Sequence, residues 1–321
     1  MIHFQTGRRR SLKNIVAGIG ALSVGALVGC TKSSTLKQQD NKGHKFRFCL
    51  NASTIRGQKL GLMREMEIAS EAGYDGIEIW IQSLQQFINE GGTAAEVKEK
   101  ATKLQLKLEG AIGFAQWIVD DQETRKKAME QAAKEMELLQ SIGCFRLAAP
   151  PAGAVRDVHI DLNDAAMRYK ELLILAEKYE VQPLLELWGF SENLSKMAEV
   201  MYVATAAGHP NAAILADVYH LFKGDSSIQS LKLLDGNVLP VFHMNDYPAS
   251  LEREIIADKD RIMPGDGVAP IHEILKILHQ KQTEIVLSVE LFSEKYWQQD
   301  PLQVAKEGLA KMQSVVQTII S

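Results

Sequence analysis

The sequence predicts a closed (β/α)8 barrel of the TIM type, formed by residues 45–321, and three observations favour this fold. First, short apolar runs alternate with longer segments whose apolar residues recur at helical spacing. Second, eight such runs are present, each followed by a helix-like segment, as is typical of a parallel barrel of ordinary size. Third, no glycine-rich nucleotide motif follows the first run, which weakens the alternative of an open doubly wound sheet.

The expected strands are short apolar runs bounded by turn residues or by a polar side chain. They occupy residues 46–51, 76–80, 106–112, 145–150, 183–187, 212–217, 238–244 and 285–291. A Pro-Pro-Ala-Gly turn closes the fourth of them. Because parallel strands all point the same way, the last residues of these runs are expected at one end of the barrel.

The expected helices are amphipathic, and glycine residues stop several of them at Gly73, Gly143 and Gly208. They occupy residues 60–72, 94–104, 125–141, 163–179, 193–207, 226–234, 271–279 and 301–320. The longest loop is expected at residues 245–268, directly after the seventh strand.

The first thirty residues are expected to be an export signal that lies outside the fold. A basic cluster, Arg8–Arg10 with Lys13, precedes an apolar glycine-rich run. The cluster resembles a twin-arginine signal, although Ser11 stands at its usual aromatic position. The residues before Cys30 resemble a bacterial lipobox, whose cysteine is lipidated, and an uncleaved anchor helix is the alternative.

The signal predicts a lipoprotein at the periplasmic face of a bacterial membrane, attached to that membrane only through its lipid. Residues 31–44 are polar and are expected to form a flexible tether. The net charge is −4, and no basic run follows the signal, so nucleic acid is not an expected partner. The remaining cysteines, Cys49 and Cys144, are expected to be reduced and buried.

Four of the expected strands each carry an acidic or imidazole group at or near the C-terminal end: Glu186, Asp217, His243 and Glu290. A carboxylate in an apolar run is costly to bury unless it is paired or binds a metal. These strands are the last four and are neighbours in a barrel, so their ends can converge on one ion. We expect one divalent metal, with Mn²⁺ favoured over Mg²⁺, Co²⁺ or Zn²⁺.

With these motifs the chain resembles the sugar phosphate isomerase/epimerase superfamily, which has a xylose isomerase-like TIM barrel. In motif it is most similar to the ketose 3-epimerases, and segment 72–80, AGYDGIEIW, is similar to the second-strand signature of the superfamily. The resemblance implies that Glu186, Asp217, His243 and Glu290 are the metal ligands. It also implies that Glu186 and Glu290 are catalytic, one removing a proton next to a carbonyl and the other returning it through an enediolate.

The resemblance further implies substrate contacts from His220, three residues after Asp217, and from Glu192, six residues after Glu186. The epimerases carry an arginine six residues after their histidine ligand, and this chain has Ala249 there. Arg261 or Arg253, in the same long loop, is the expected replacement. Trp188, at the end of the fifth strand, is a candidate to contact a sugar ring.

The predicted function is a metal-dependent sugar isomerase or epimerase. Because sugar phosphates are mainly cytoplasmic, an exported member is expected to act on an unphosphorylated sugar or glycoside derivative. The alternatives are a lyase or hydrolase on a keto-sugar and a non-catalytic sugar-binding lipoprotein. A homodimer or homotetramer is compatible with the superfamily. Glu78 has two interpretations, a substrate-site carboxylate or a group paired to a neighbouring strand.

Overall fold

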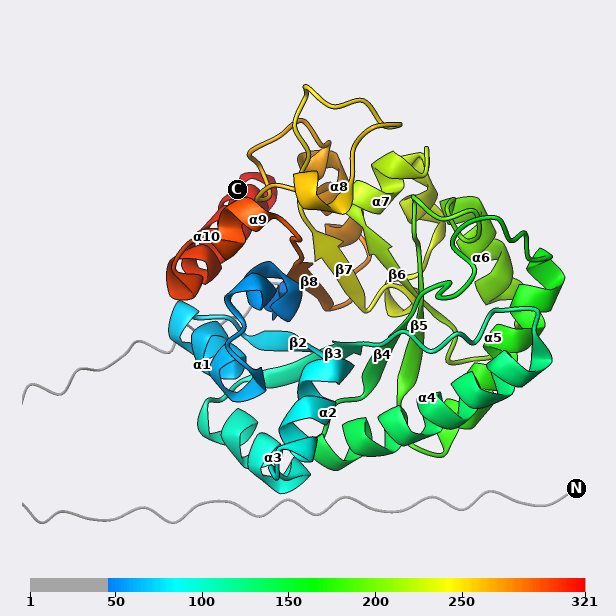
Figure 1. Ribbon diagram of the computed structural model, residues 1–321. Coiled ribbons are helices and arrows are strands. Elements are labelled where there is room, and N and C mark those ends of the chain that lie inside the picture. The colour runs from blue at the N-terminus through cyan, green and yellow to red at the C-terminus, as the bar shows by residue number, and fades with distance from the viewer. Residues whose placement is uncertain (1–45, 321) are drawn as a thin grey trace, which may run out of the picture. The chain divides into compact units, whose positions relative to one another are not determined.

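The computed structural model describes residues 46–320 and arranges eight parallel strands in a closed barrel, as Figure 1 shows. Each strand pairs with the next along the chain, and β8 closes the barrel by pairing with β1. The strands are β1 Phe46–Asn51, β2 Gly76–Trp80, β3 Lys107–Ile112, β4 Arg146–Ala149, β5 Gln182–Glu186, β6 Ala213–Asp217, β7 Val241–Met244 and β8 Ile285–Val289. The predicted fold class is confirmed.

Helices surround the barrel, and the longest of them return the chain from the end of one strand to the start of the next (Figure 1). The α-helices are α1 Leu62–Ala72, α2 Ile81–Asn89, α3 Ala94–Lys103, α4 Gln122–Ile142, α5 Leu162–Glu177, α6 Met197–Ala206, α7 Val218–Lys223, α8 Ile271–His279, α9 Glu294–Trp297 and α10 Pro301–Ile320. Short 3-10 helices are η1 Ala52–Gln58, η2 Ile228–Leu233, η3 Gly236–Val238 and η4 Asp258–Asp260. Within residues 46–320, none of the helices is long and apolar enough to span a membrane.

The helices differ from the prediction in several places. Two helices that begin directly at a strand end, α2 and α7, are absent from the prediction, because β2 and β6 run into them without a loop. Expected helix 193–207 begins only at Met197 in α6, and expected helix 226–234 is the 3-10 helix η2. The predicted export signal, Cys30 and the tether lie outside the described residues.

The core has two parts, one between strands and helices and one inside the barrel. The inner part contains Cys49, Ala52, Trp80, Ile112, Ala148, Leu184, Ala213, Leu215, Val241 and Val286. Side chains of alternate residues along each strand point inward, so these residues, apart from Ala52 of η1, fill the lumen of the barrel up to the strand ends. Cys49 and Cys144 are both free and buried, as predicted.

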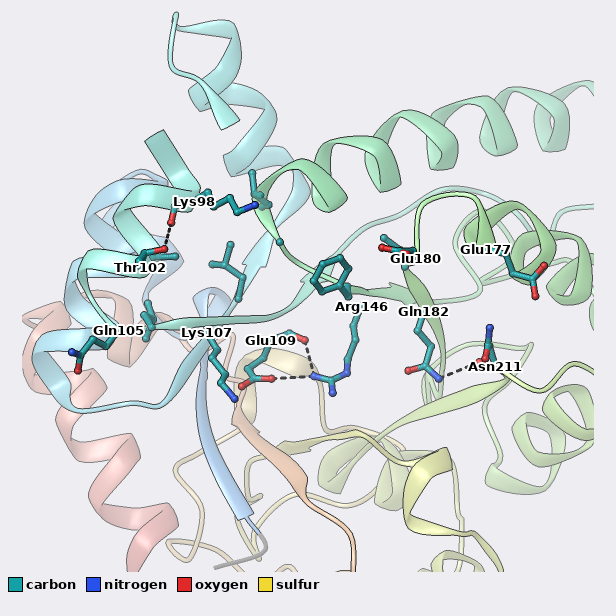
Figure 2. Close-up of a pocket in the computed structure, with 17 residues that line it drawn as sticks. Lys98, Thr102, Gln105, Lys107, Glu109, Arg146, Glu177, Glu180, Gln182 and Asn211 are labelled. Carbon is teal, nitrogen blue, oxygen red and sulfur yellow. Dashed lines mark hydrogen bonds and ion pairs between the residues drawn. The ribbon is translucent and has the colours of Figure 1, made fainter. Parts of the chain in front are cut away.

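Charged residues close the N-terminal end of the barrel. Arg47 Nη1 and Arg146 Nη1 lie 2.6 and 3.0 Å from the two carboxylate oxygens of buried Glu109. Arg47 also pairs with Glu284, at the start of β8. Figure 2 shows Glu109 and Arg146 on an open groove, ≈ 960 Å³ in volume, which Gln182 and the ends of α3 and α5 also line. Every carboxylate in this network thus faces a guanidinium.

Candidate metal and substrate site

The polar side chains of the last four strands meet at the C-terminal end of the barrel. Glu186 and Asp217 are the last residues of β5 and β6, and Glu290 directly follows β8. His243 lies in β7, where it pairs in register with Asp217 of β6. All four residues are buried, with exposed fractions of 5% or less. The geometry expected from strand-end positions is therefore present.

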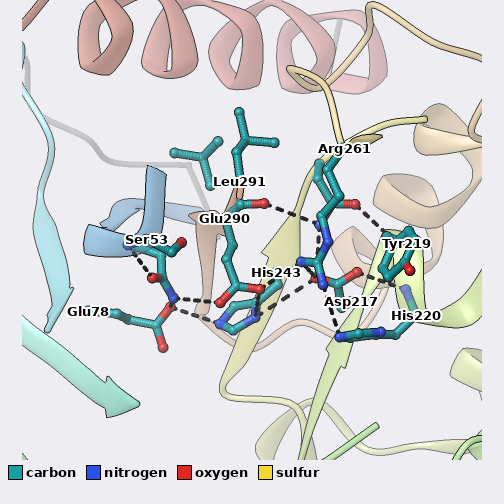
Figure 3. A network of polar contacts seen from close by, with 12 residues as sticks. Ser53, Glu78, Asp217, Tyr219, His220, His243, Arg261, Glu290 and Leu291 are labelled. Carbon is teal, nitrogen blue, oxygen red and sulfur yellow. Dashed lines mark hydrogen bonds and ion pairs between the residues drawn. The ribbon is translucent and has the colours of Figure 1, made fainter. Parts of the chain in front are cut away.

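Asp217, His243 and Glu290 form the compact part of the site, shown in Figure 3. One ligand atom from each residue lies within 4.8 Å of the others. His243 Nδ1 is 3.1 Å from Glu290 Oε2 and 3.9 Å from Asp217 Oδ2. Two carboxylates and an imidazole are a donor set that suits a divalent ion such as Zn²⁺ or Mn²⁺. Glu186, the fourth predicted ligand, is not in this compact group.

Glu186 lies on the wall of a cavity that adjoins the compact group. The cavity has a volume of ≈ 210 Å³. It is lined by Trp80, Ile112, Phe114, Glu186, Trp188, Phe190, His220, Asp258, Arg261, Glu290 and Phe292. The predicted catalytic pair, Glu186 and Glu290, therefore shares one small space with the predicted substrate residues Trp188, His220 and Arg261.

Arg261 crosses from the long loop into the site, where it is 1% exposed. Its Nη1 atom donates to Glu290 Oε2 at 2.8 Å and to Asp217 Oδ2 at 3.1 Å (Figure 3). Its Nη2 atom contacts Asp258 and lies 3.1 Å from His220 Nε2. Arg253 instead pairs with Asp225. Of the two arginines considered in place of the one missing at Ala249, Arg261 reaches the acidic cluster.

The loop that carries Arg261 is held at its base by Asp246. The Asp246 carboxylate accepts hydrogen bonds from the backbone N–H groups of Gly265, Gly267 and Ala269, at 2.9 to 3.0 Å. Its backbone also forms an antiparallel bridge with Ile262, the residue after Arg261. A Cβ atom on Gly267 would lie 2.4 Å from Asp246 Oδ1, so this close approach requires glycine.

Charge and burial give the two catalytic candidates, Glu186 and Glu290, very different pKa values. Burial, reinforced by the nearby Glu290, raises the pKa of Glu186 to about 8. Burial alone would raise the pKa of Glu290 as well, but His243 and Arg261 outweigh it and lower that pKa to about 2. Burial and the charge of Arg261 hold the pKa of His220 well below its usual value. Two carboxylates on one cavity thus differ strongly in proton affinity.

Several buried polar atoms of the site have no hydrogen-bond partner within the described chain. They are Glu186 Oε2, His220 Nδ1, His243 Nδ1 and Arg261 Nε. A buried polar atom left without a partner costs about 1–3 kcal/mol, and protein interiors rarely tolerate several together. Their concentration around one cavity fits a site that binds a metal ion and a polar ligand.

Glu192 differs from what the sequence suggested, and Glu78 makes a contact beyond the one predicted. Glu192 is exposed in the loop after β5 and is not among the residues that line the cavity. Its backbone N–H donates to the Val155 carbonyl. Glu78 is buried and is paired to the neighbouring strand β1 through Asn51 Nδ2, as one interpretation predicted, and it also lies 2.9 Å from His243 Nε2, across the barrel. The position of Glu78 inside the second expected strand was the only sign in the sequence that this carboxylate is buried in the barrel.

Comparisons with known proteins agree with this architecture. The family described as "Xylose isomerase-like TIM barrel" matches residues 66–315, so the chain belongs to this family. An inosose isomerase of Bacillus velezensis is 26% identical over 81% of this chain and 95% of its own length. A fructoselysine 3-epimerase of Escherichia coli O157:H7 is 22% identical over 82% of this chain and 96% of its own length.

Solved structures show the same fold. The crystal structure of IolI protein with a bound zinc atom superposes with a TM-score of 0.79 at 22% identity, over 86% of this chain and 99% of that one. D-psicose 3-epimerase from Clostridium cellulolyticum H10, solved with D-tagatose, gives 0.68 at 18% identity, over 84% of this chain and 99% of that one.

Proposed function

We propose that this member of the xylose isomerase-like TIM barrel family is a divalent-metal-dependent isomerase or epimerase of an unphosphorylated sugar or a related polyhydroxy ketone. The observation that carries the proposal is the set of unpartnered buried atoms on one cavity, Glu186 Oε2, His220 Nδ1 and Arg261 Nε, next to the compact group of Asp217, His243 and Glu290. The curated relatives named inosose isomerase and fructoselysine 3-epimerase support the same class of reaction.

Asp217, His243 and Glu290 are the residues that would hold the ion, with Glu186 as the predicted fourth ligand. The donor set fits such an ion, because His243 Nδ1 lies beside two carboxylates, 3.1 Å from Glu290 Oε2 and 3.9 Å from Asp217 Oδ2. A bound divalent cation would supply positive charge where negative charge develops on the substrate oxygens. Mn²⁺ is the proposed ion, and zinc is the ion named for one structural neighbour.

The two cavity carboxylates can divide the proton transfer between them. Glu290 is kept unprotonated by His243 and Arg261, whereas burial makes Glu186 hold a proton near neutral pH in the absence of metal. Removal of a proton from carbon and its return need one base and one acid, and environments that separate two pKa values provide them. We assign these two roles to Glu186 and Glu290.

The contacts of His220 define which of its ring nitrogens can donate a hydrogen bond. A guanidinium has donors only, so Arg261 Nη2 at 3.1 Å requires His220 Nε2 to accept. The proton of the neutral ring then lies on Nδ1, which is buried and has no partner. Because the pKa of His220 is far below its usual value, the ring stays neutral and can donate this bond to a substrate oxygen.

The cavity wall favours an uncharged substrate. Arg261 is the only arginine or lysine among the lining residues, and its charge is already engaged by Asp217, Glu290 and Asp258. A phosphate group would therefore find no free cation on this wall. Five aromatic rings complete the wall and suit the C–H faces of a sugar ring. They belong to Trp80, Phe114, Trp188, Phe190 and Phe292.

The proposal includes an exported lipoprotein, anchored through Cys30, and assembly as a homodimer or homotetramer. An exported enzyme would meet free sugars rather than sugar phosphates, which agrees with a cavity wall whose one arginine is already paired with carboxylates. Membrane fractionation with and without a Cys30→Ala substitution, and light scattering of the domain 45–321, would check these two points.

The test is exchange of a carbon-bound proton with D₂O, followed by NMR on a panel of free ketoses, inososes and 3-keto-glycosides. The metal-loaded wild type is expected to exchange at least one of them. Glu186→Gln and Glu290→Gln are each expected to lose about 10²–10⁴-fold in rate, as for removal of a general acid or base. Glu192→Gln, on the exposed loop, is the matched control and should stay within about threefold of wild type. Equal rates in all four proteins would refute the assigned roles.

A further inference from the structure

We infer that Glu78 is a positioning residue: it holds the proton of His243 on Nε2, and so directs the Nδ1 lone pair toward Asp217 and Glu290. The inference rests on the metal site of the proposed function and assigns a role to a carboxylate from the opposite side of the barrel. Glu78 is in the middle of β2 and is 1% exposed.

The contact between Glu78 and His243 defines which ring nitrogen carries the proton. Glu78 Oε2 lies 2.9 Å from His243 Nε2, within hydrogen-bond distance. An ionised carboxylate has acceptors only, so the imidazole must donate from Nε2. The other tautomer would place two acceptors against each other at this distance. Whether the ring is neutral or protonated, Nε2 therefore keeps its proton, and only Nδ1 is available to a metal.

Asn51 holds Glu78 in this orientation. Its Nδ2 atom lies 3.3 Å from Glu78 Oε2 and 3.1 Å from Glu290 Oε1 (Figure 3). Asn51 Oδ1 accepts a hydrogen bond from the backbone N–H of Ser53, which leaves the amide NH₂ to face the two carboxylates. One asparagine therefore links the positioning carboxylate to a candidate ligand, and the amide orientation follows from its partners.

A glycine on the neighbouring strand β3 leaves space for the Glu78 carboxylate. A Cβ atom on Gly110 of β3 would lie 3.1 Å from Glu78 Oε1, tighter than an ordinary contact. Glu78 is thus enclosed between a glycine on one side and the Asn51 amide on the other. In protein metal sites, a carboxylate on the far nitrogen of a histidine ligand orients the ring, and its loss typically weakens metal binding 10–100-fold.

Two substitutions separate positioning from simple charge. Glu78→Gln keeps the length of the side chain and one acceptor but removes the charge. Glu78→Asp keeps the charge but withdraws the carboxylate from Nε2. Positioning predicts zinc affinity within about threefold of wild type for E78Q and about 10–100-fold weaker for E78D. A purely electrostatic role predicts the reverse order, and that result would overturn the inference.

The affinities can be measured by chelator competition with Zn²⁺ on the purified domain. Long-range ¹H–¹⁵N NMR of the zinc-loaded protein gives an independent readout, because it identifies the protonated ring nitrogen. We expect Nε2–H on His243 in wild type and E78Q, and a mixture of tautomers in E78D. Nδ1–H in the wild type would contradict the inference.

Glu135→Leu is the matched control, since Glu135 is a carboxylate of similar burial on α4, outside the site. It should leave zinc affinity unchanged whatever it does to stability. If wild type itself binds no divalent ion, the proposed function fails. If wild type binds zinc and E78D binds it equally well with the same tautomer, only the role of Glu78 fails.

Discussion

The two ends of the barrel both combine carboxylates with guanidinium groups, but they use them differently. At the N-terminal end, Glu109 contacts both Arg47 and Arg146, and Arg47 also contacts Glu284. At the C-terminal end, four buried carboxylates face one guanidinium and one imidazole. These carboxylates are Glu78, Glu186, Asp217 and Glu290, and their counterparts are Arg261 and His243.

The difference shows which end of the fold is complete without a ligand. The ionic groups of the N-terminal network are all paired, whereas Glu186 Oε2 is buried and lacks a hydrogen-bond partner among the described residues. An excess of buried negative charge is unfavourable unless a cation neutralises it. The N-terminal network is thus expected to act on stability alone, and the C-terminal group on binding.

The largest effect is expected from breaking the N-terminal network. Glu109→Gln removes the charge that two arginines contact, and because a hydrogen bond to a charged group contributes about 1.5–3 kcal/mol, we expect a loss of about 3 kcal/mol or more in the free energy of unfolding. Urea denaturation measures this loss. Glu284→Gln, whose side chain is 56% exposed, is the control and should cost less than about 1 kcal/mol. Similar losses in both variants would show that the buried Glu109 contributes no more to stability than the exposed Glu284.

The next effect is on metal binding, at the other end. Asp217→Asn is expected to weaken binding of Zn²⁺ or Mn²⁺ about 100-fold, because a charged ligand is lost. The fold should persist, since Asp217 also caps α7 and asparagine is an equally favoured cap. Titration calorimetry measures the affinity, with Glu109→Gln as the comparison. A metal affinity lowered equally by both substitutions would show that the two ends are not independent.

The smallest expected effect is an increase in stability, opposite in sign to the loss expected for Glu109→Gln. Without metal, Glu186→Gln is expected to stabilise the protein by about 1–2 kcal/mol, because it removes a desolvated carboxyl group. The pKa of Glu186 is raised to about 8, so the folded wild type binds this proton more tightly than the unfolded chain. Wild type should therefore lose stability as the pH rises from about 4.5 to 8, and the variant gains its advantage over that range.

Thermal unfolding in EDTA at pH 4, 6 and 8 measures this difference. We expect equal melting temperatures at pH 4 and a higher value for E186Q at pH 8. A variant that is less stable than wild type at pH 8 would mean that Glu186 makes a stabilising contact in the metal-free protein.

The fold was predictable because it depends on patterns that are local in sequence. Each strand is a short apolar run between turn signals, and all eight lie where the pattern indicated. The strand-end residues Asp217, His243 and Glu290 were also predictable, since adjacent parallel strands bring their ends together whatever the loops do. Helices α2 and α7 were missed because no turn residue separates them from the preceding strand.

The rest of the site depends on contacts that the sequence pattern does not encode. Glu192 was expected at the substrate but lies on the surface, because the direction of a loop side chain follows from how the loop packs. The partners of Arg261 depend on a fold of the long loop, which Asp246 fixes from a distance in sequence. The pairing of Glu78 with His243 crosses the barrel, and strand order alone does not predict such a contact.

The anchoring of the long loop by Asp246 has a consequence for how this protein could diversify. Asp246 and Ile262 are joined by backbone hydrogen bonds, so the segment between them is an excursion with both ends fixed. Asp258 and Arg261, near its second end, line the cavity, whereas Ser250 near its tip is exposed and is not among the lining residues. The exposed tip can therefore vary in length and sequence with little effect on the residues of the site, and a library at positions 249–255 would measure that tolerance directly.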